Sequence, residues 1–194
     1  MKKIILSIFA LGTLAMNAQD VTGFSKGNIA LTTGLGYTNT PGGADTSTST
    51  FSISPSLMYM TTANWGIMGG IEFNSRSVNP GGGLASTSRS NFGLAGGARY
   101  FFTPANRLSF YLGAGASARF GEDLTTGAKA TTIGLEFRPG VNYFIHKNWA
   151  MGANFNLATL TIATPDGGDA TTDFNVNNAT NLGGLNFTLM YVIK

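Results

Sequence analysis

RLSFYLGAGASARFG, residues 107–121, alternates apolar side chains with small or polar ones at every second position. One face carries Leu108, Phe110, Leu112, Ala114, Ala116, Ala118 and Phe120, and the other carries Ser109, Tyr111, Gly113, Gly115, Ser117 and Arg119. This period of two indicates a β-strand with two different faces. The stretch also contains GAGASA, which fits the G-x-G-x-x-A pattern of a dinucleotide-binding turn, but such a turn requires a helix directly after it. RFGEDLTTG follows instead, so these glycines are interpreted as part of a strand wall.

The same alternation recurs along the rest of the chain and predicts eight strands. They cover Gly27–Asn39, Thr50–Thr62, Trp65–Ser77, Arg89–Phe102, Arg107–Gly121, Lys129–Ile145, Trp149–Ala163 and Thr180–Lys194. Each is longer than the usual globular strand of about 5–6 residues. A tilted strand that crosses a bilayer needs about 9–11 residues, which these segments supply.

The connections between the predicted strands are of two alternating kinds. Three are short: Ala63-Asn64, TPAN (103–106) and HKN (146–148). Four are longer and rich in Gly, Ser, Thr, Asp and Asn: TPGGADTSTS, VNPGGGLASTS, EDLTTGA and TPDGGDATTDFNVNNA. Short periplasmic turns and long outer loops are typical of outer-membrane barrels. Pro55 and Pro139 fall inside predicted strands, where each removes a ladder hydrogen bond, and therefore predict local bulges.

The composition and the first residues indicate an exported chain. MKKIILSIFALGTLAMNAQD predicts a secretory signal peptide over residues 1–18, which leaves residues 19–194 as the barrel domain. Removing Lys2 and Lys3 lowers the net charge from +3 to +1, so the charge is no argument for nucleic-acid binding. The chain has no cysteine, which excludes disulfides and thiolate metal sites. No later segment has the length of a transmembrane helix, so the mature chain would enter a membrane only as a closed barrel.

The charged residues decide which face meets lipid. Glu72, Arg99, Arg119, Glu136 and Arg138 all fall on the polar face of their strands. An Arg or Lys on the lipid face costs about 2–4 kcal/mol near the bilayer midplane. We therefore expect the apolar face to point outward and the five charged residues to form an interior ion network. A structural network is preferred to a gate in which Arg138 or Arg99 exchanges carboxylate partners.

Two further groups of side chains sort by depth. Large apolar residues on the inward face lie close to the short turns and predict a plug in the lumen. They are Met58, Met60, Phe101, Tyr111, Phe144, Met190 and Val192. Aromatic residues on the outward face near the same turns predict an interfacial girdle. They are Tyr59, Trp65, Tyr100, Phe102, Phe110, Tyr143, Trp149 and Tyr191, with Tyr37, Phe51, Phe73, Phe92 and Phe120 as a sparser second belt.

Over Gly27–Lys194 this pattern resembles the small eight-stranded outer-membrane barrels, the OmpA-like and OmpX-like proteins of the porin family. The Ala18-Gln19 boundary resembles those of Bacteroidota exports. The resemblance rests on architecture and implies an all-β, eight-stranded, antiparallel up-and-down transmembrane barrel in the outer membrane. It also implies outer-membrane lipid, lipopolysaccharide and the barrel assembly machinery as partners. The family often ends in an aromatic residue, whereas this chain ends in Lys194.

Several functions fit such a barrel. The preferred one is a structural or surface-interaction role with a largely plugged lumen and an extracellular ligand at the loops. The alternatives are a narrow porin-like channel gated by the Glu/Arg network and a soluble secreted ligand-binding barrel. Asp166, Asp169 and Asp173 lack the spacing of a calcium loop. The single histidine, His146, lies in a short turn, so no nucleophile–base pair can be assembled, and neither an enzyme nor a cofactor is predicted.

Overall fold

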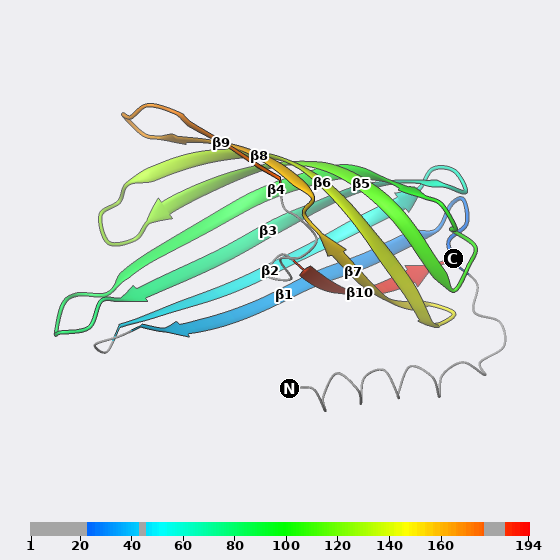
Figure 1. Ribbon diagram of the computed structural model, residues 1–194, viewed down its shortest axis with the longest axis horizontal. Helices are drawn as coiled ribbons and strands as arrows, with labels where there is room; N and C mark the ends of the chain where they lie inside the picture. The colour runs from blue at the N-terminus through cyan, green and yellow to red at the C-terminus, as the bar shows by residue number, and fades with distance from the viewer. Residues whose placement is uncertain (1–22, 43–45, 177–184) are drawn as a thin grey trace.

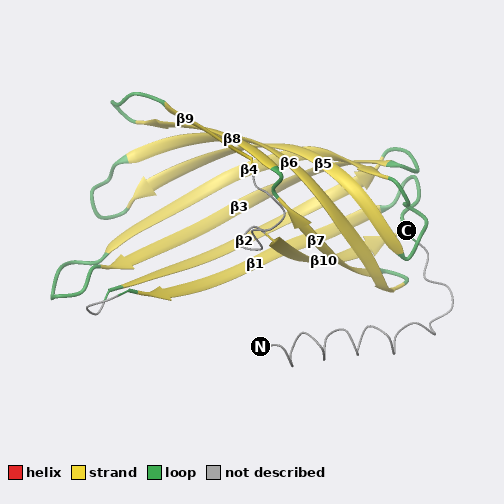
Figure 2. Cartoon of the chain, in the orientation of Figure 1, coloured by secondary structure: helices red, strands yellow, loops and turns green. Residues whose placement is uncertain are grey.

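The computed structural model describes residues 23–42, 46–176 and 185–194, and this part of the chain is a barrel of antiparallel strands (Figures 1 and 2). The strands are β1 (Ile29–Pro41), β2 (Ser47–Met60), β3 (Trp65–Asn79), β4 (Thr87–Phe101), β5 (Leu108–Asp123), β6 (Lys129–His146), β7 (Trp149–Phe155), β8 (Ala158–Pro165), β9 (Thr171–Val176) and β10 (Leu185–Ile193). No helix in these ranges is long and apolar enough to cross a membrane. The predicted signal peptide lies outside the described residues and stays a prediction.

The strand pairings close the sheet on itself. Each of β1 to β6 pairs with the next strand in the chain, and β10 pairs with both β7 and β1. β7 and β8 both pair with β6 and together occupy the seventh position, while β9 and β10 share the eighth. This confirms the predicted eight-stranded, antiparallel, up-and-down barrel. Closure satisfies the backbone polar groups that an open sheet edge would expose.

The seventh predicted strand is interrupted in the structure. β7 ends at Phe155 and β8 begins at Ala158. Gly140 pairs with Asn154 and Phe137 with Ala158, so the register against β6 changes by one residue between them. Pro139 lies in this interval and has no N–H to donate. The predicted irregularity at Pro139 is therefore present, and the extra residue belongs to the partner strand.

No bulge occurs at Pro55, so that prediction was wrong. Ile53 and Ser56 pair with Phe73 and Gly70 in one unchanged register, and Pro55 itself stands opposite Thr33 of β1. The ladder to β3 omits Ser54 and Pro55. The missing N–H is accommodated by leaving out pairings, without inserting a residue.

The strands extend further into the predicted loops than the sequence indicated. β3 runs to Asn79 and β4 begins at Thr87, so the connection between them is short. β9 occupies part of the long loop that was predicted before the last strand. The structure describes the predicted strand Thr180–Lys194 only from Leu185 onward, where β10 begins. Threonine-rich segments retain a strong preference for strands, which explains the extension. In Figure 1 these hairpins project to the left, opposite the short turns and the C-terminus.

The closing seam is short. The ladder between β1 and β10 covers Ile29–Thr33, paired with Leu189–Ile193. Leu185–Thr188 of β10 pair with β7 on their other side. In the described part of the chain, β1 and β10 therefore separate beyond Thr33.

Candidate functional site in the barrel interior

The short-turn end of the barrel is filled by apolar side chains. All seven residues of the predicted plug are buried, with exposed fractions of 0–3%, in one cluster that also contains Ala30, Ala150 and Phe24. Phe101 and Tyr111 lie with their ring centroids 5.5 Å apart. An eight-stranded barrel encloses little more than side chains, so this layer blocks the lumen at its base.

Phe24 belongs to this plug although the sequence did not indicate it. Its ring is 2% exposed and lies 4.7 Å from Phe101 and 5.0 Å from Phe144, centroid to centroid. The segment before β1 is held by backbone hydrogen bonds, because Phe24 N–H donates to the Pro104 carbonyl at 2.7 Å and Gly27 N–H to that of Met60 at 2.8 Å. The chain therefore folds back beneath the barrel and inserts one ring into its base.

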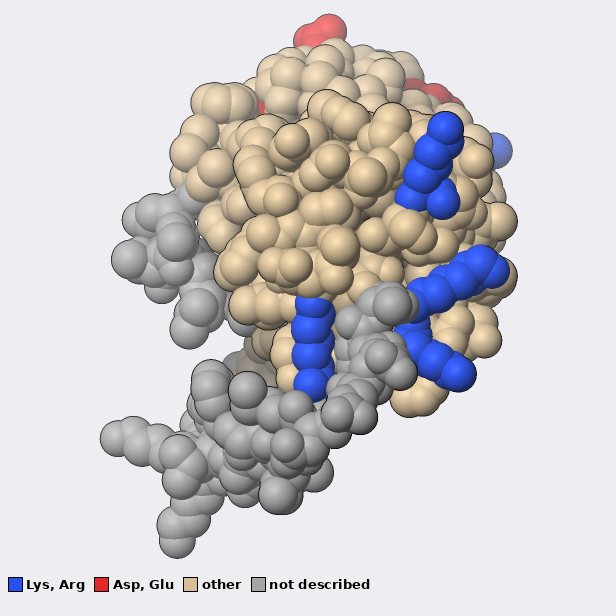
Figure 3. Space-filling model, turned by 90° about the vertical axis from the view of Figure 1, so that its right-hand side faces the viewer, with Lys and Arg blue, Asp and Glu red and all other residues tan. Residues whose placement is uncertain are grey.

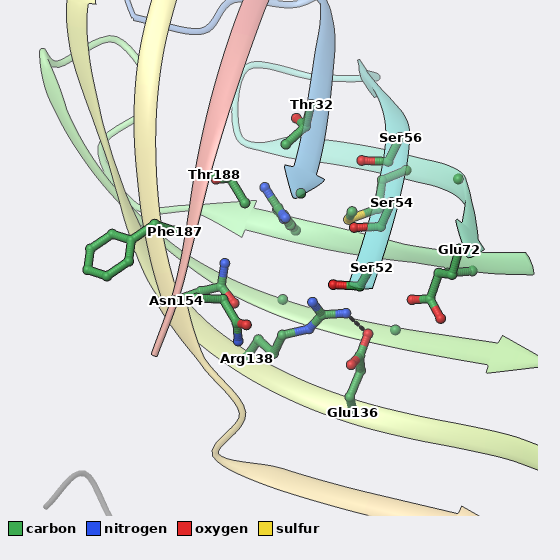
Figure 4. Close-up of a pocket in the computed structure, with 18 of the residues that line it drawn as sticks. Thr32, Ser52, Ser54, Ser56, Glu72, Glu136, Arg138, Asn154, Phe187 and Thr188 are labelled. Carbon is green, nitrogen blue, oxygen red and sulfur yellow. Dashed lines mark ion pairs between the residues drawn. The ribbon is translucent and has the colours of Figure 1, made fainter. Parts of the chain in front are cut away.

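Above the plug lies a polar cavity of about 570 Å³. Its lining includes Tyr111 of the plug and the middle parts of β1 and β2. Ser52, Ser54 and Ser56 direct their hydroxyls into it from β2 (Figure 4). Glu72, Arg99, Glu136 and Arg138 supply its charged groups.

The five charged residues predicted as one interior network are distributed over two ion pairs and one separate cation. Arg119 Nε donates to Glu72 Oε2 at 2.6 Å. Arg138 pairs with Glu136, two residues earlier on the same strand (Figure 4). Arg99 is 7% exposed, and its guanidinium carbon lies 4.6 Å from the Tyr111 ring centroid. Among the described residues no carboxylate lies within ion-pair distance of Arg99.

The glycines of GAGASA make room for these charged side chains. A Cβ on Gly115 would lie only 3.0 Å from Glu136 Oε1, which is a tight approach, whereas one on Gly113 would lie 3.3 Å from the Arg138 carbonyl oxygen and in ordinary contact with Arg99 Cγ at 3.4 Å. Both positions face inward, next to long side chains of the neighbouring strands β4 and β6. The motif therefore serves lumen packing, as interpreted from the sequence.

The Glu72–Arg119 pair links β3 to β5 across β4, and we expect a measurable coupling between the two residues. Glu72→Gln and Arg119→Gln should each lower the free energy of unfolding in detergent by about 1–2 kcal/mol, the value for a partly exposed charge-assisted hydrogen bond. The double variant should lose clearly less than the sum of the two. Additive losses in this double-mutant cycle would show that the pair is not formed.

The predicted girdle residues lie on the outer surface near the short turns. The ring centroids of Trp65 and Tyr100 are 5.2 Å apart, and those of Trp149 and Tyr191 are 5.0 Å apart. Tyr59 is 45% exposed, and Tyr143 carries the Arg107 guanidinium carbon 4.9 Å above its ring centroid. Aromatic rings at this level suit a membrane–water interface.

The short-turn end is also basic. Figure 3 views this end and shows Lys and Arg side chains across it. Lys26, Arg107, Lys147 and Lys194 lie in the segments that form it. The acidic residues that the structure describes belong to the cavity or to the opposite end of the barrel.

At the opposite end, Asp123 organises the turn between β5 and β6. Its Oδ1 accepts hydrogen bonds from the N–H groups of Thr125 at 3.0 Å and Thr126 at 3.1 Å. These bonds favour the charged carboxylate and lower the pKa of Asp123 below its usual value. The hydrogen-bonded Asp123 carboxylate therefore contributes to the free energy of unfolding in full above the usual aspartate pKa. This contribution is lost as the pH falls through the lowered pKa of the folded protein.

The other polar residues considered in the sequence form no metal centre. In the described ranges no group of three or more His, Cys, Asp or Glu side chains could hold a metal ion. Asp173 lies in β9, whereas Asp166 and Asp169 lie in the turn before it. His146 is the last residue of β6, at the short-turn end.

Comparison with known proteins agrees with this geometry. A family model described as "Outer membrane protein beta-barrel domain" matches residues 6–183. No curated protein matches the chain. The crystal structure of the outer membrane protein OprG from Pseudomonas aeruginosa superimposes with a TM-score of 0.52 at 16% identity, over 90% of this chain and 99% of that chain. Ail, the attachment invasion locus protein of Yersinia pestis, gives a TM-score of 0.46 at 14% identity, over 87% and 99%.

The likeness to OprG concerns the fold, and the family match covers most of the sequence, including all strands up to β9. The chain belongs to the family of outer membrane protein beta-barrel domains.

Proposed function

We propose that the protein is a closed outer-membrane barrel with a structural or surface-interaction role and no continuous solute pathway. One observation carries this proposal: the apolar layer at the short-turn end, in which Phe24, Phe101 and Phe144 are at most 2% exposed. In barrels of this kind the short turns face the periplasm. The layer therefore separates the polar cavity from the periplasm.

The outward surface supports residence in lipid. Ile67, Leu94 and Phe110 are each more than half exposed, although they are large and apolar. A water-soluble ligand-binding barrel places such residues inside, so this alternative is set aside. The projecting hairpins at the other end offer the surface for contacts outside the cell, because recognition commonly uses loops on a rigid scaffold.

A narrow gated channel is the second candidate, and the polar cavity favours it. The cavity is lined by Arg and Glu side chains of both charges, which a gate would require. However, an exchange of ion-pair partners among these side chains would widen the cavity only. The apolar plug below the cavity would stay closed. A channel would need Phe24 to leave the base as well.

Planar-bilayer recording tests the proposal. The wild-type protein should show no steady openings, because the base is filled. The Phe24→Ala/Phe101→Ala double variant should show leak currents if it still inserts, since it removes two rings from the layer. Steady wild-type openings whose ion selectivity changes in Arg138→Gln would instead establish the gated channel.

Truncating the β8–β9 turn, residues 166–170, tests the surface role separately. The truncated barrel should retain its fold and lose binding to cells or extracellular matrix, compared with an equal truncation of the β5–β6 turn. Unchanged binding in both variants would contradict a role for these hairpins.

A further inference from the structure

Arg99 is a buried cation that has no carboxylate within ion-pair distance in the part of the chain that the structure describes. Its side chain lines the cavity and belongs to a residue that is 7% exposed. Both cavity carboxylates are engaged elsewhere, Glu72 with Arg119 and Glu136 with Arg138. The guanidinium lies over the Tyr111 ring, and no hydrogen bond joins its N–H groups to another described side chain, so these donors are available to a ligand in the cavity. A buried charge of this kind is stabilised by an anion that accepts its hydrogen bonds.

A second polar group in the same cavity has the opposite requirement. Asn154 is 3% exposed, and its Oδ1 atom has no hydrogen-bond partner among the described residues. This oxygen is an acceptor, so it requires a donor. Ser52, Ser54 and Ser56 face the same space and can both donate and accept.

We propose that the cavity binds a hydroxyl-bearing organic anion, whose carboxylate or phosphate group is held by Arg99 and whose hydroxyl groups contact Asn154 and the serines of β2. The volume of about 570 Å³ lies within the range of small-molecule sites, about 300–1,000 Å³. Because the base of the barrel is closed, a ligand bound here could not continue to the periplasm, and the cavity is a binding site rather than part of a transport channel. Only this last point rests on the proposed function.

Two sources can present the same chemistry. A small solute would enter from the long-loop end. The headgroup of phosphatidylglycerol also combines a phosphate with hydroxyls, and it would approach through the separation between β1 and β10. There Leu35, Tyr37 and Phe187 border the cavity and are 74%, 68% and 69% exposed. Phe187 points away from Arg138, toward the outside of the barrel (Figure 4).

Side-chain NMR of the full mature barrel in uncharged detergent tests the proposal. Gluconate or glycerol 3-phosphate should shift the Arg99 Nε–Hε and Asn154 Nδ2–H resonances saturably, with a dissociation constant on the order of 1 mM. Sorbitol, which has the hydroxyls of gluconate without its charge, should not. The Arg89 resonance serves as an internal control, because that side chain is at the outer rim and 60% exposed.

Variants and lipid then separate the alternatives. Arg99→Gln should weaken binding at least about tenfold, while Arg89→Gln removes the same charge outside the cavity and should leave binding unchanged. The barrel is then placed in nanodiscs of phosphatidylglycerol or of phosphatidylcholine. If the anion comes from lipid, the Arg99 resonance should differ between the two lipids. If it comes from a solute, the resonance should be the same in both. The proposal is overturned if neither soluble probe nor phosphatidylglycerol moves the Arg99 resonance, or if sorbitol acts as gluconate does. The wild-type titration decides this even if Arg99→Gln fails to fold, and none of these results depends on the bilayer recordings.

Discussion

Phe101→Ala is expected to lower the free energy of unfolding by about 3–5 kcal/mol, the usual cost of removing a buried phenylalanine ring. Phe101 is 0% exposed and packs against both Phe24 and Tyr111. Its loss opens a cavity in the only layer that the described residues fill with closely packed apolar side chains. Urea unfolding from lipid vesicles, followed by tryptophan fluorescence, measures the change.

The neighbouring residue supplies the control. Phe102 is the same residue type but is 59% exposed and contacts Tyr100 on the outer surface, with ring centroids 5.3 Å apart. Phe102→Ala should cost no more than about 1.5 kcal/mol, the scale of a surface aromatic pair. Equal losses at the two positions would show that the base of the barrel is not a packed plug.

Ala116→Arg is expected to destabilise the inserted barrel by about 2–4 kcal/mol, the depth-dependent cost of an arginine on the lipid face near the midplane. Ala116 is exposed on the outer face of β5, opposite Gly96 of β4 and Leu135 of β6. It lies between Phe110 and Phe120, which the aromatic pattern places at the two membrane interfaces. The unfolding midpoint in vesicles should shift accordingly.

The same substitution outside the membrane distinguishes lipid exposure from a general effect of charge. Ala85 is exposed in the connection between β3 and β4. Ala85→Arg should change the free energy of unfolding by less than about 0.5 kcal/mol. If Ala116→Arg is equally mild, the outer face of β5 does not contact hydrocarbon.

The faces of the strands, and the plug residues that lie on strands, could be predicted from the sequence because both follow from a period of two. Once Phe110 points outward, Tyr111 must point inward. Nearness to a short turn then sets depth, which is why Met60 and Phe101, at the ends of their strands, lie in the same layer. No side-chain geometry is needed for either inference.

Three features could not be predicted in this way. Phe24 lies in a short segment without alternation, and its insertion depends on a hydrogen bond to Pro104, far along the chain. Gly23, directly before Phe24, is required for this approach, because a side chain there would overlap the Pro104 carbonyl oxygen. Arg99 forms no ion pair with a described carboxylate because Arg119 and Arg138 pair with Glu72 and Glu136, and the sequence does not show which arginine reaches which carboxylate. The break between β7 and β8 depends on how the partner strand accommodates Pro139.

Spin labelling along β2 tests the central claim most directly, because the chain has no cysteine that must first be removed. Single cysteines replace Ser52, Ile53, Ser54, Ser56 and Leu57 in turn, and each carries a nitroxide label in lipid vesicles. Labels at Ile53 and Leu57 should collide with oxygen dissolved in the lipid, while labels at the three serine positions should be reached instead by a water-soluble nickel reagent or be shielded from both. Oxygen accessibility that peaks at the serines, or that does not alternate along β2, would contradict a barrel with its apolar face in lipid and its ionic face enclosed.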